Sequence, residues 1–196
     1  LLSHVTHDLH YRDRTGDVHM LLPPTRTRTP IQHNYAGRSP LRFFDYIPND
    51  EGEMVERTLA QVAFPSELRN LLILLQPADD SWQRVRSFVL DDAVETFPRN
   101  SVRVLNASQY MLACDIDGRQ SLVAPNQEVQ SALEEGSTFV SWRIAAKIDD
   151  EWRLVRASSS QFLPGMRQLI VVNVDVSGDQ PSLDILSLRD RPRSVD

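Results

Sequence analysis

The chain of 196 residues has little of several residue types that mark common functions. Its single cysteine, Cys114, cannot form a disulfide within the chain. Its seven glycines are scattered and form no glycine-rich loop that would cradle a phosphate. The longest apolar run, residues 71–75, is far shorter than the ~20 residues that a membrane-spanning helix requires. We therefore expect no internal disulfide, no phosphate loop and no membrane span.

Positive charge is also scarce, and almost all of it comes from arginine. The formal net charge is -6, the pI is about 5.4, and Lys147 is the one lysine among 21 basic residues. General nucleic-acid binding requires a basic face that replaces counterions, so we expect no nucleic-acid partner. Arginine favours bidentate pairing with carboxylates and stacking on aromatic rings. A genome-wide codon bias explains the same excess equally well.

Apolar and polar residues alternate in the centre of the chain, over residues 101–129. Leu112, Cys114 and Ile116 fall on one row, and this period of two is typical of a strand with one face inward. Asp117-Gly118 favours a two-residue hairpin turn, because both residues tolerate a positive φ. The pattern predicts a β-meander of three short strands.

Similar alternation recurs along most of the chain. The strands that it predicts lie at 1–11, 18–22, 41–47, 55–64, 82–90, 138–148, 151–157, 167–176 and 182–188, with a loop at Ser158–Ser160. Residues 66–75 fit either a helix capped by Ser66 or a strand buried on both faces, and the compact apolar run favours the strand. About a dozen short strands with turns every eight to twelve residues indicate β-sandwiches.

The predicted fold is therefore all-β, with two immunoglobulin-like β-sandwiches in tandem. Residues 97–100, Phe-Pro-Arg-Asn, read as a linker between the halves. The predicted domains are an N-terminal β-sandwich over residues 1–98 and a C-terminal β-sandwich over residues 99–196. The alternative is one large β-sandwich in which both halves share a core.

Two stretches carry a resemblance to a known group of proteins. They are FVLDD at 88–92 followed by Phe97-Pro98 and SVRVLN at 101–106, and Ala124-Pro125 leading into the strand pair of Trp142 and Trp152. Over about residues 41–174 the chain resembles uncharacterised exported bacterial proteins with immunoglobulin-like sandwich folds. The resemblance implies export across the inner membrane and a role in the envelope or outside the cell, and it brings no catalytic residues. The chain begins at Leu1 rather than Met, which we expect of an excerpt or of a processed product such as one whose signal peptide has been removed.

Candidate metal ligands are present, but their spacing is unfavourable. All five histidines, His4, His7, His10, His19 and His33, lie near the start of the chain and lack the same-face pairs of a tight site. Acidic residues at 13–17, 79–80, 91–92 and 149–150 fit turns better than a calcium loop. Ser158–Ser160 has no nucleophile-elbow pattern. We assign no catalytic, cofactor-binding or metal-ligating residue and expect a protein that is not an enzyme.

Four further side chains could have either a structural or a functional role. Cys114 lies on an inward row and is expected to be an inert core residue, with an intermolecular disulfide as the alternative. Trp142 is expected in the core, whereas Trp82 and Trp152 are equally compatible with a sugar-stacking surface.

The leading functional hypothesis is a non-catalytic structural subunit of an exported bacterial cell-surface or extracellular assembly, either a fibre or a coat. Residues 1–22 and the TRTRT segment at 25–29 are too polar to stand alone and suit addition to an open sheet edge. The expected partners are further copies or other envelope proteins, and the expected location is the periplasm, the cell surface or the medium. The alternative is a monomeric envelope binding module for a glycan or a peptide.

Overall fold

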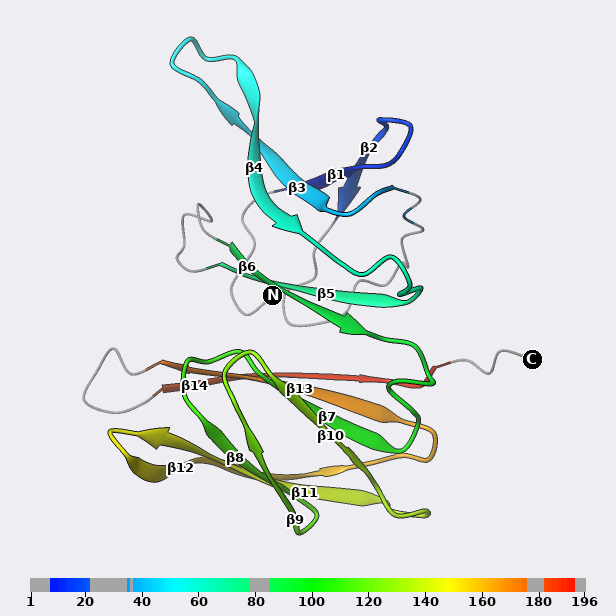
Figure 1. Ribbon diagram of the computed structural model, residues 1–196, viewed down its shortest axis with the longest axis vertical. Helices are drawn as coiled ribbons and strands as arrows, with labels where there is room; N and C mark the ends of the chain where they lie inside the picture. Colours follow the sequence, from blue (N-terminus) through cyan, green and yellow to red (C-terminus); the bar gives the residue numbers. More distant parts are fainter. Residues whose placement is uncertain (1–7, 22–34, 36, 78–84, 176–181, 193–196) are drawn as a thin grey trace. The chain divides into compact units, whose positions relative to one another are not determined.

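The computed structural model describes residues 8–21, 35, 37–77, 85–175 and 182–192, and these residues fold into strands without any helix (Figure 1). The strands are β1 (Leu9–Arg12), β2 (Val18–Leu21), β3 (Leu41–Pro48), β4 (Met54–Val62), β5 (Leu71–Pro77), β6 (Val85–Asp91), β7 (Ser101–Asn106), β8 (Leu112–Ile116), β9 (Arg119–Val123), β10 (Glu128–Ala132), β11 (Phe139–Ile148), β12 (Glu151–Gln161), β13 (Arg167–Asp175) and β14 (Ser182–Asp190). The prediction of an all-β fold is confirmed.

The strands belong to two compact units, Leu1–Asp92 and Ala93–Asp196. The sequence placed the boundary after Pro98, six residues later than the observed division (98 − 92). The second unit begins before the predicted linker because Phe97 belongs to its packing: Phe97 is 1% exposed and contacts two arginines of that unit. That each unit is an immunoglobulin-like domain stays a prediction.

The first unit combines a four-stranded antiparallel sheet, in the order β2-β1-β3-β4, with the two-stranded β5-β6 ribbon. Leu9 and Tyr11 of β1 contribute to its core, and Ile73 and Val89 of the ribbon pack against that core. β5 pairs with β6 along its whole length. The choice of a strand rather than a helix in this segment is therefore confirmed.

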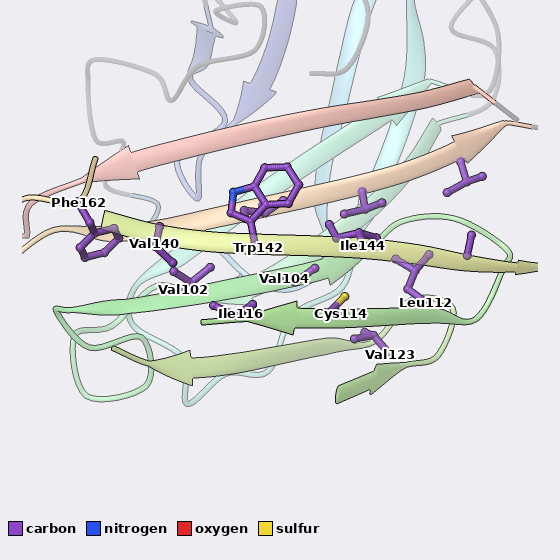
Figure 2. Close-up of a cluster of buried hydrophobic side chains, with 14 of the residues drawn as sticks. Val102, Val104, Leu112, Cys114, Ile116, Val123, Val140, Trp142, Ile144 and Phe162 are labelled. Carbon is purple, nitrogen blue, oxygen red and sulfur yellow. The ribbon is translucent and has the colours of Figure 1, made fainter. Parts of the chain in front are cut away.

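The second unit is a β-sandwich of two four-stranded layers, which lie one above the other in Figure 1. One layer has the order β10-β7-β13-β14, and the other has the order β12-β11-β8-β9. The inward side chains of both layers form the core, and Figure 2 shows those of β7, β8, β9 and β11. The strand predicted at 138–148 buries every second residue of β11 in this core: Val140, Trp142, Ile144, Ala146 and Ile148.

The predicted meander at 101–129 is wrong in one respect. β8 and β9 form the expected hairpin, with positive φ at Asp117 and Gly118. β7, however, lies in the other layer, where it pairs antiparallel with β10 and parallel with β13. The first two strands of an immunoglobulin constant domain share a sheet, so the strand order differs from that domain at this point.

A buried asparagine lies where the chain changes layers after β7. The Asn106 amide is fully buried, and its Nδ2 donates to the carbonyl oxygens of Tyr110 at 2.7 Å and Val123 at 2.9 Å. Its Oδ1 accepts hydrogen bonds from the backbone N–H and the hydroxyl of Ser108. These bonds satisfy main-chain groups around the crossing, where buried polar groups without partners would be costly.

Phe97 packs against two buried guanidinium groups. Arg103 and Arg167 lie 4.4 and 4.8 Å from its ring centroid, and both residues are 3% exposed. Arg167 also forms a bidentate pair with Asp190 at 2.8 and 2.9 Å and donates to the Phe97 carbonyl oxygen at 3.0 Å. This cluster fixes the segment before β7 to the sandwich.

We predict that Arg167→Met destabilises the second unit by about 3 kcal/mol, because it leaves the partners of a buried charge without their donor. Urea unfolding measures the change. The matched control is Arg143→Met, which removes an exposed guanidinium from its pair with Asp115 and should change the unfolding midpoint little. Equal loss in both variants would contradict a structural role for the buried cluster.

Candidate functional site

The described histidines do not come together. His10 stacks on Phe44 with ring centroids 5.7 Å apart and meets Tyr46 edge-on at 5.2 Å. His19 stacks on Tyr11 at 4.9 Å, and its Nε2 lies 2.8 Å from Asp13 Oδ2. His4, His7 and His33 lie outside the described residues. Within the described part of the chain, no group of three or more His, Cys, Asp or Glu side chains is placed to hold a metal ion.

The acidic segment 13–17 is a hydrogen-bonded turn between β1 and β2. Asp13 Oδ1 accepts from the Thr15 hydroxyl at 2.6 Å, from the Thr15 N–H at 2.9 Å and from the Asp17 N–H at 3.1 Å. The Thr15 hydrogen bond, followed by the His19 contact, holds the pKa of the Asp13 carboxyl far below its usual range. The carboxylate oxygens therefore organise the turn.

We predict that the Asp13 carboxyl titrates well below the usual value of 3.8. A lowered folded-state pKa stabilises the turn above the unfolded pKa, and this stabilisation is lost as the pH falls through the folded pKa. Carboxyl carbon NMR of the labelled protein measures the midpoint. Thr15→Val removes the largest cause and should move the midpoint upward; an unchanged midpoint would contradict the assignment.

The other candidate site residues from the sequence analysis, where the structure describes them, lie in turns or in the core. Asp149 and Asp150 form a turn with φ of 50° and 64°, and Asp150 pairs with Lys147 Nζ at 2.8 Å. Cys114 is 2% exposed, and burial raises the pKa of its thiol to about 12, so the prediction of a buried cysteine is confirmed. Trp142 lies in the core as predicted. Trp82 and the acidic pair 79–80 lie outside the described residues.

A group of charged and aromatic side chains surrounds Phe44 in the first unit. Phe44 is 1% exposed, with the Arg12 and Arg42 guanidinium carbons 5.2 and 5.6 Å from its ring centroid. Arg12 pairs with Glu56 at 2.6 Å, and Arg42 pairs with the other oxygen of the same carboxylate. The two arginines share the Glu56 carboxylate as partner, so we interpret this group as one that stabilises the packing of the sheet.

The second unit has an edge strand of unusual length. β12 (Glu151–Gln161) has 11 residues and lies at the end of its sheet, and among the described strands it pairs only with β11. The predicted loop at Ser158–Ser160 is wrong, because these serines lie in β12 opposite Val140–Trp142. Serine has no strong strand preference, and the pairing with β11 decides its conformation.

An apolar row crosses the outer face of the same sheet. Leu154 of β12 is in register with Ala145 of β11, Ala145 with Ala113 of β8, and Ala113 with Leu122 of β9. Leu154 and Leu122 are 66% and 68% exposed, and Trp152, two residues before Leu154, is 47% exposed. The row is therefore an exposed apolar strip with small residues at its centre.

Paired charges flank this strip. The Arg143 guanidinium lies 2.6 Å from Asp115 Oδ2, and the hydrogen bond from Arg143 lowers the pKa of that carboxyl. We use the term contact surface for the β12 edge together with the strip of Leu154, Ala145, Ala113 and Leu122. Its chemistry consists of main-chain hydrogen bonding and apolar contact.

Sequence analysis found part of this surface. It predicted the strand at 151–157 that carries Trp152 and Leu154, but it did not connect this strand to Leu122, which lies some thirty residues earlier (154 − 122). Only the register of four strands brings the two leucines onto one strip, and no local sequence signal records that register.

A scan against protein-family models and a search of curated proteins found no match to this chain. No helix among the described residues has the length and apolar character needed to span a membrane.

Proposed function

We propose that the protein is a non-catalytic structural subunit of an exported bacterial cell-surface or extracellular assembly, joined to its neighbours by β-strand contacts. The observation that carries the proposal is the edge of β12, which pairs on one side only among the described strands. An edge strand presents a row of N–H and C=O groups to which another chain can add a strand.

The two halves of β12 differ in how they protect this edge. The first half carries Glu151, Arg153 and Arg156, and the register shifts by one residue where Ile144 and Ala145 face Arg156 and Leu154. Charges and bulges are the usual devices that prevent edge pairing. The second half, residues 157–161 with the sequence ASSSQ, contains no charge, no proline and no register shift. It is the part of β12 suited to accept a strand.

The N-terminal segment supports the proposal less than its sequence suggested. β1 lies inside its sheet between β2 and β3, and its apolar residues Leu9 and Tyr11 are buried in the core of the first unit. The described residues of the segment thus have partners within the chain. Residues 1–7 and the TRTRT segment lie outside the described residues. Among the described strands, β2, at the end of that sheet, also has an open edge but is only 4 residues long, so the proposed contact is on the 11-residue β12.

The proposed location outside the inner membrane rests on the resemblance to exported bacterial proteins. The proposed partners are further copies of this chain or other envelope proteins. The second candidate function is a monomeric binding module for a glycan or a peptide, and the observation that favours it is the exposed Trp152 beside Arg153.

We predict that the purified chain self-associates as its concentration rises, because each added strand satisfies main-chain groups of the β12 edge. Sedimentation velocity over micromolar to near-millimolar concentrations measures the size. A chain that stays monomeric throughout would contradict the structural-subunit proposal. It would favour the binding module, for which loss of glycan or peptide binding in Trp152→Ala is the corresponding test.

A further inference from the structure

We propose that the second half of β12 pairs antiparallel with the same segment of a second copy, around a two-fold axis at Ser159. This inference rests on the proposed function and names its contact and its partner. The pairing would join the two β12-β11-β8-β9 sheets edge to edge into one continuous sheet.

The hydrogen-bond directions in β12 follow from its ladder with β11. The Phe162 N–H donates to the Thr138 carbonyl oxygen at 2.7 Å, in the same register as the pairs Phe139–Gln161 and Val140–Ser160. Hydrogen-bonded and non-hydrogen-bonded pairs alternate along an antiparallel ladder. Even-numbered residues from 156 to 160 therefore bond to β11, and the main-chain groups of residues 157, 159 and 161 point away from it.

An independent contact on the other side of β11 gives the same alternation. The Lys147 N–H donates to the Met111 carbonyl oxygen at 2.9 Å, in register with the pairing of Ala145 and Ala113. The odd-numbered residues of β11 therefore bond towards β8, and its even-numbered residues bond towards β12. The outward direction at Ala157, Ser159 and Gln161 is thus fixed from two sides.

The outward main-chain groups of this segment are complementary to themselves. With the axis at Ser159, Ala157 faces Gln161 of the copy, Ser159 faces Ser159, and Gln161 faces Ala157. Each of these three pairs exchanges two hydrogen bonds, so the contact gains about six. No residue in the three pairs carries a charge, so the paired segment places no like charges opposite one another.

The inward side chains supply a second reason for this register. Ser160 Oγ is buried and has no hydrogen-bond partner within the described chain. In the proposed pairing Ser160 lies directly opposite Ser158 of the copy, in a non-hydrogen-bonded pair whose side chains approach closely. The Ser158 hydroxyl of the second copy is thus positioned to satisfy the buried oxygen.

An axis at Ser158 or Ser160 would form only two hydrogen-bonded pairs within residues 157–161 instead of three. Charge and chain geometry disfavour axes further along the strand. In the proposed register the two Arg156 side chains are six residue steps apart, about 20 Å, which exceeds the screening length at physiological salt. An axis at Ala157 would require the strand around Val155 to pair with the second copy, and the register of β12 is irregular there. An axis at Gln161 would extend it beyond the end of β12, towards Pro164.

Cysteine cross-linking tests the register. In Ser159→Cys the two Cα atoms would lie about 5.5 Å apart across the axis, within the range of a disulfide. We expect mild oxidation of the full-length variant to give a covalent dimer that reducing agent reverses. Cys114 adds little background, because it is 2% exposed.

The matched control is Gln161→Cys, which places the two cysteines four residue steps apart, about 13 Å along the strand. It should not cross-link, whereas the double variant Ala157→Cys/Gln161→Cys should, because those positions face each other. Cross-linking of Gln161→Cys at the same rate as Ser159→Cys would show random collision and overturn the proposal.

The outcomes separate this inference from the proposed function. A chain that self-associates while Ser159→Cys gives no covalent dimer would overturn the β12 pairing and leave the structural-subunit proposal intact. In that case, association weakened by Leu122→Lys but not by Ser159→Lys would assign the contact to the apolar strip. The β12 pairing predicts the reverse, because two lysines would face each other at the axis. A chain that neither associates nor cross-links contradicts both proposals.

Discussion

The second unit depends on one constraint: every main-chain N–H and C=O group in a sheet needs a hydrogen-bond partner. β11 meets this requirement on both sides, with β8 as one neighbour and β12 as the other. β12 meets it on one side only among the described strands. The same alternation that makes β11 a stable centre of the sheet therefore leaves outward-pointing groups at alternate residues of β12.

Asn106 lies at the crossing between layers that precedes this sheet. A meander would have placed β7 beside β8, but the buried Asn106 amide bonds to the Tyr110 and Val123 carbonyl oxygens where the chain crosses to the other layer. The side of β8 left open by β7 is occupied by β11, and β12 follows at the end of the sheet. The layer change at Asn106 is thus part of the strand order that leaves β12 at an edge.

Local patterns in the sequence predicted much of the fold. The period of two identified the all-β class, the strand that became β11 and the burial of Cys114 and Trp142, because these features depend on neighbouring residues. The Asp117-Gly118 turn was predicted from backbone preferences alone. The layer change at Asn106 and the strand conformation of Ser158–Ser160 were missed, because each depends on a partner distant in the sequence. The strip joining Leu122 and Leu154 was missed for the same reason.

Amide hydrogen exchange along β12, measured by NMR at two protein concentrations, tests the central claim most directly. The account predicts that the Ser158 and Ser160 amides are protected at both concentrations through their bonds to β11. The Ala157, Ser159 and Gln161 amides should exchange rapidly in dilute solution and become protected when the protein is concentrated. Rapid exchange of these three amides at every concentration would contradict the account.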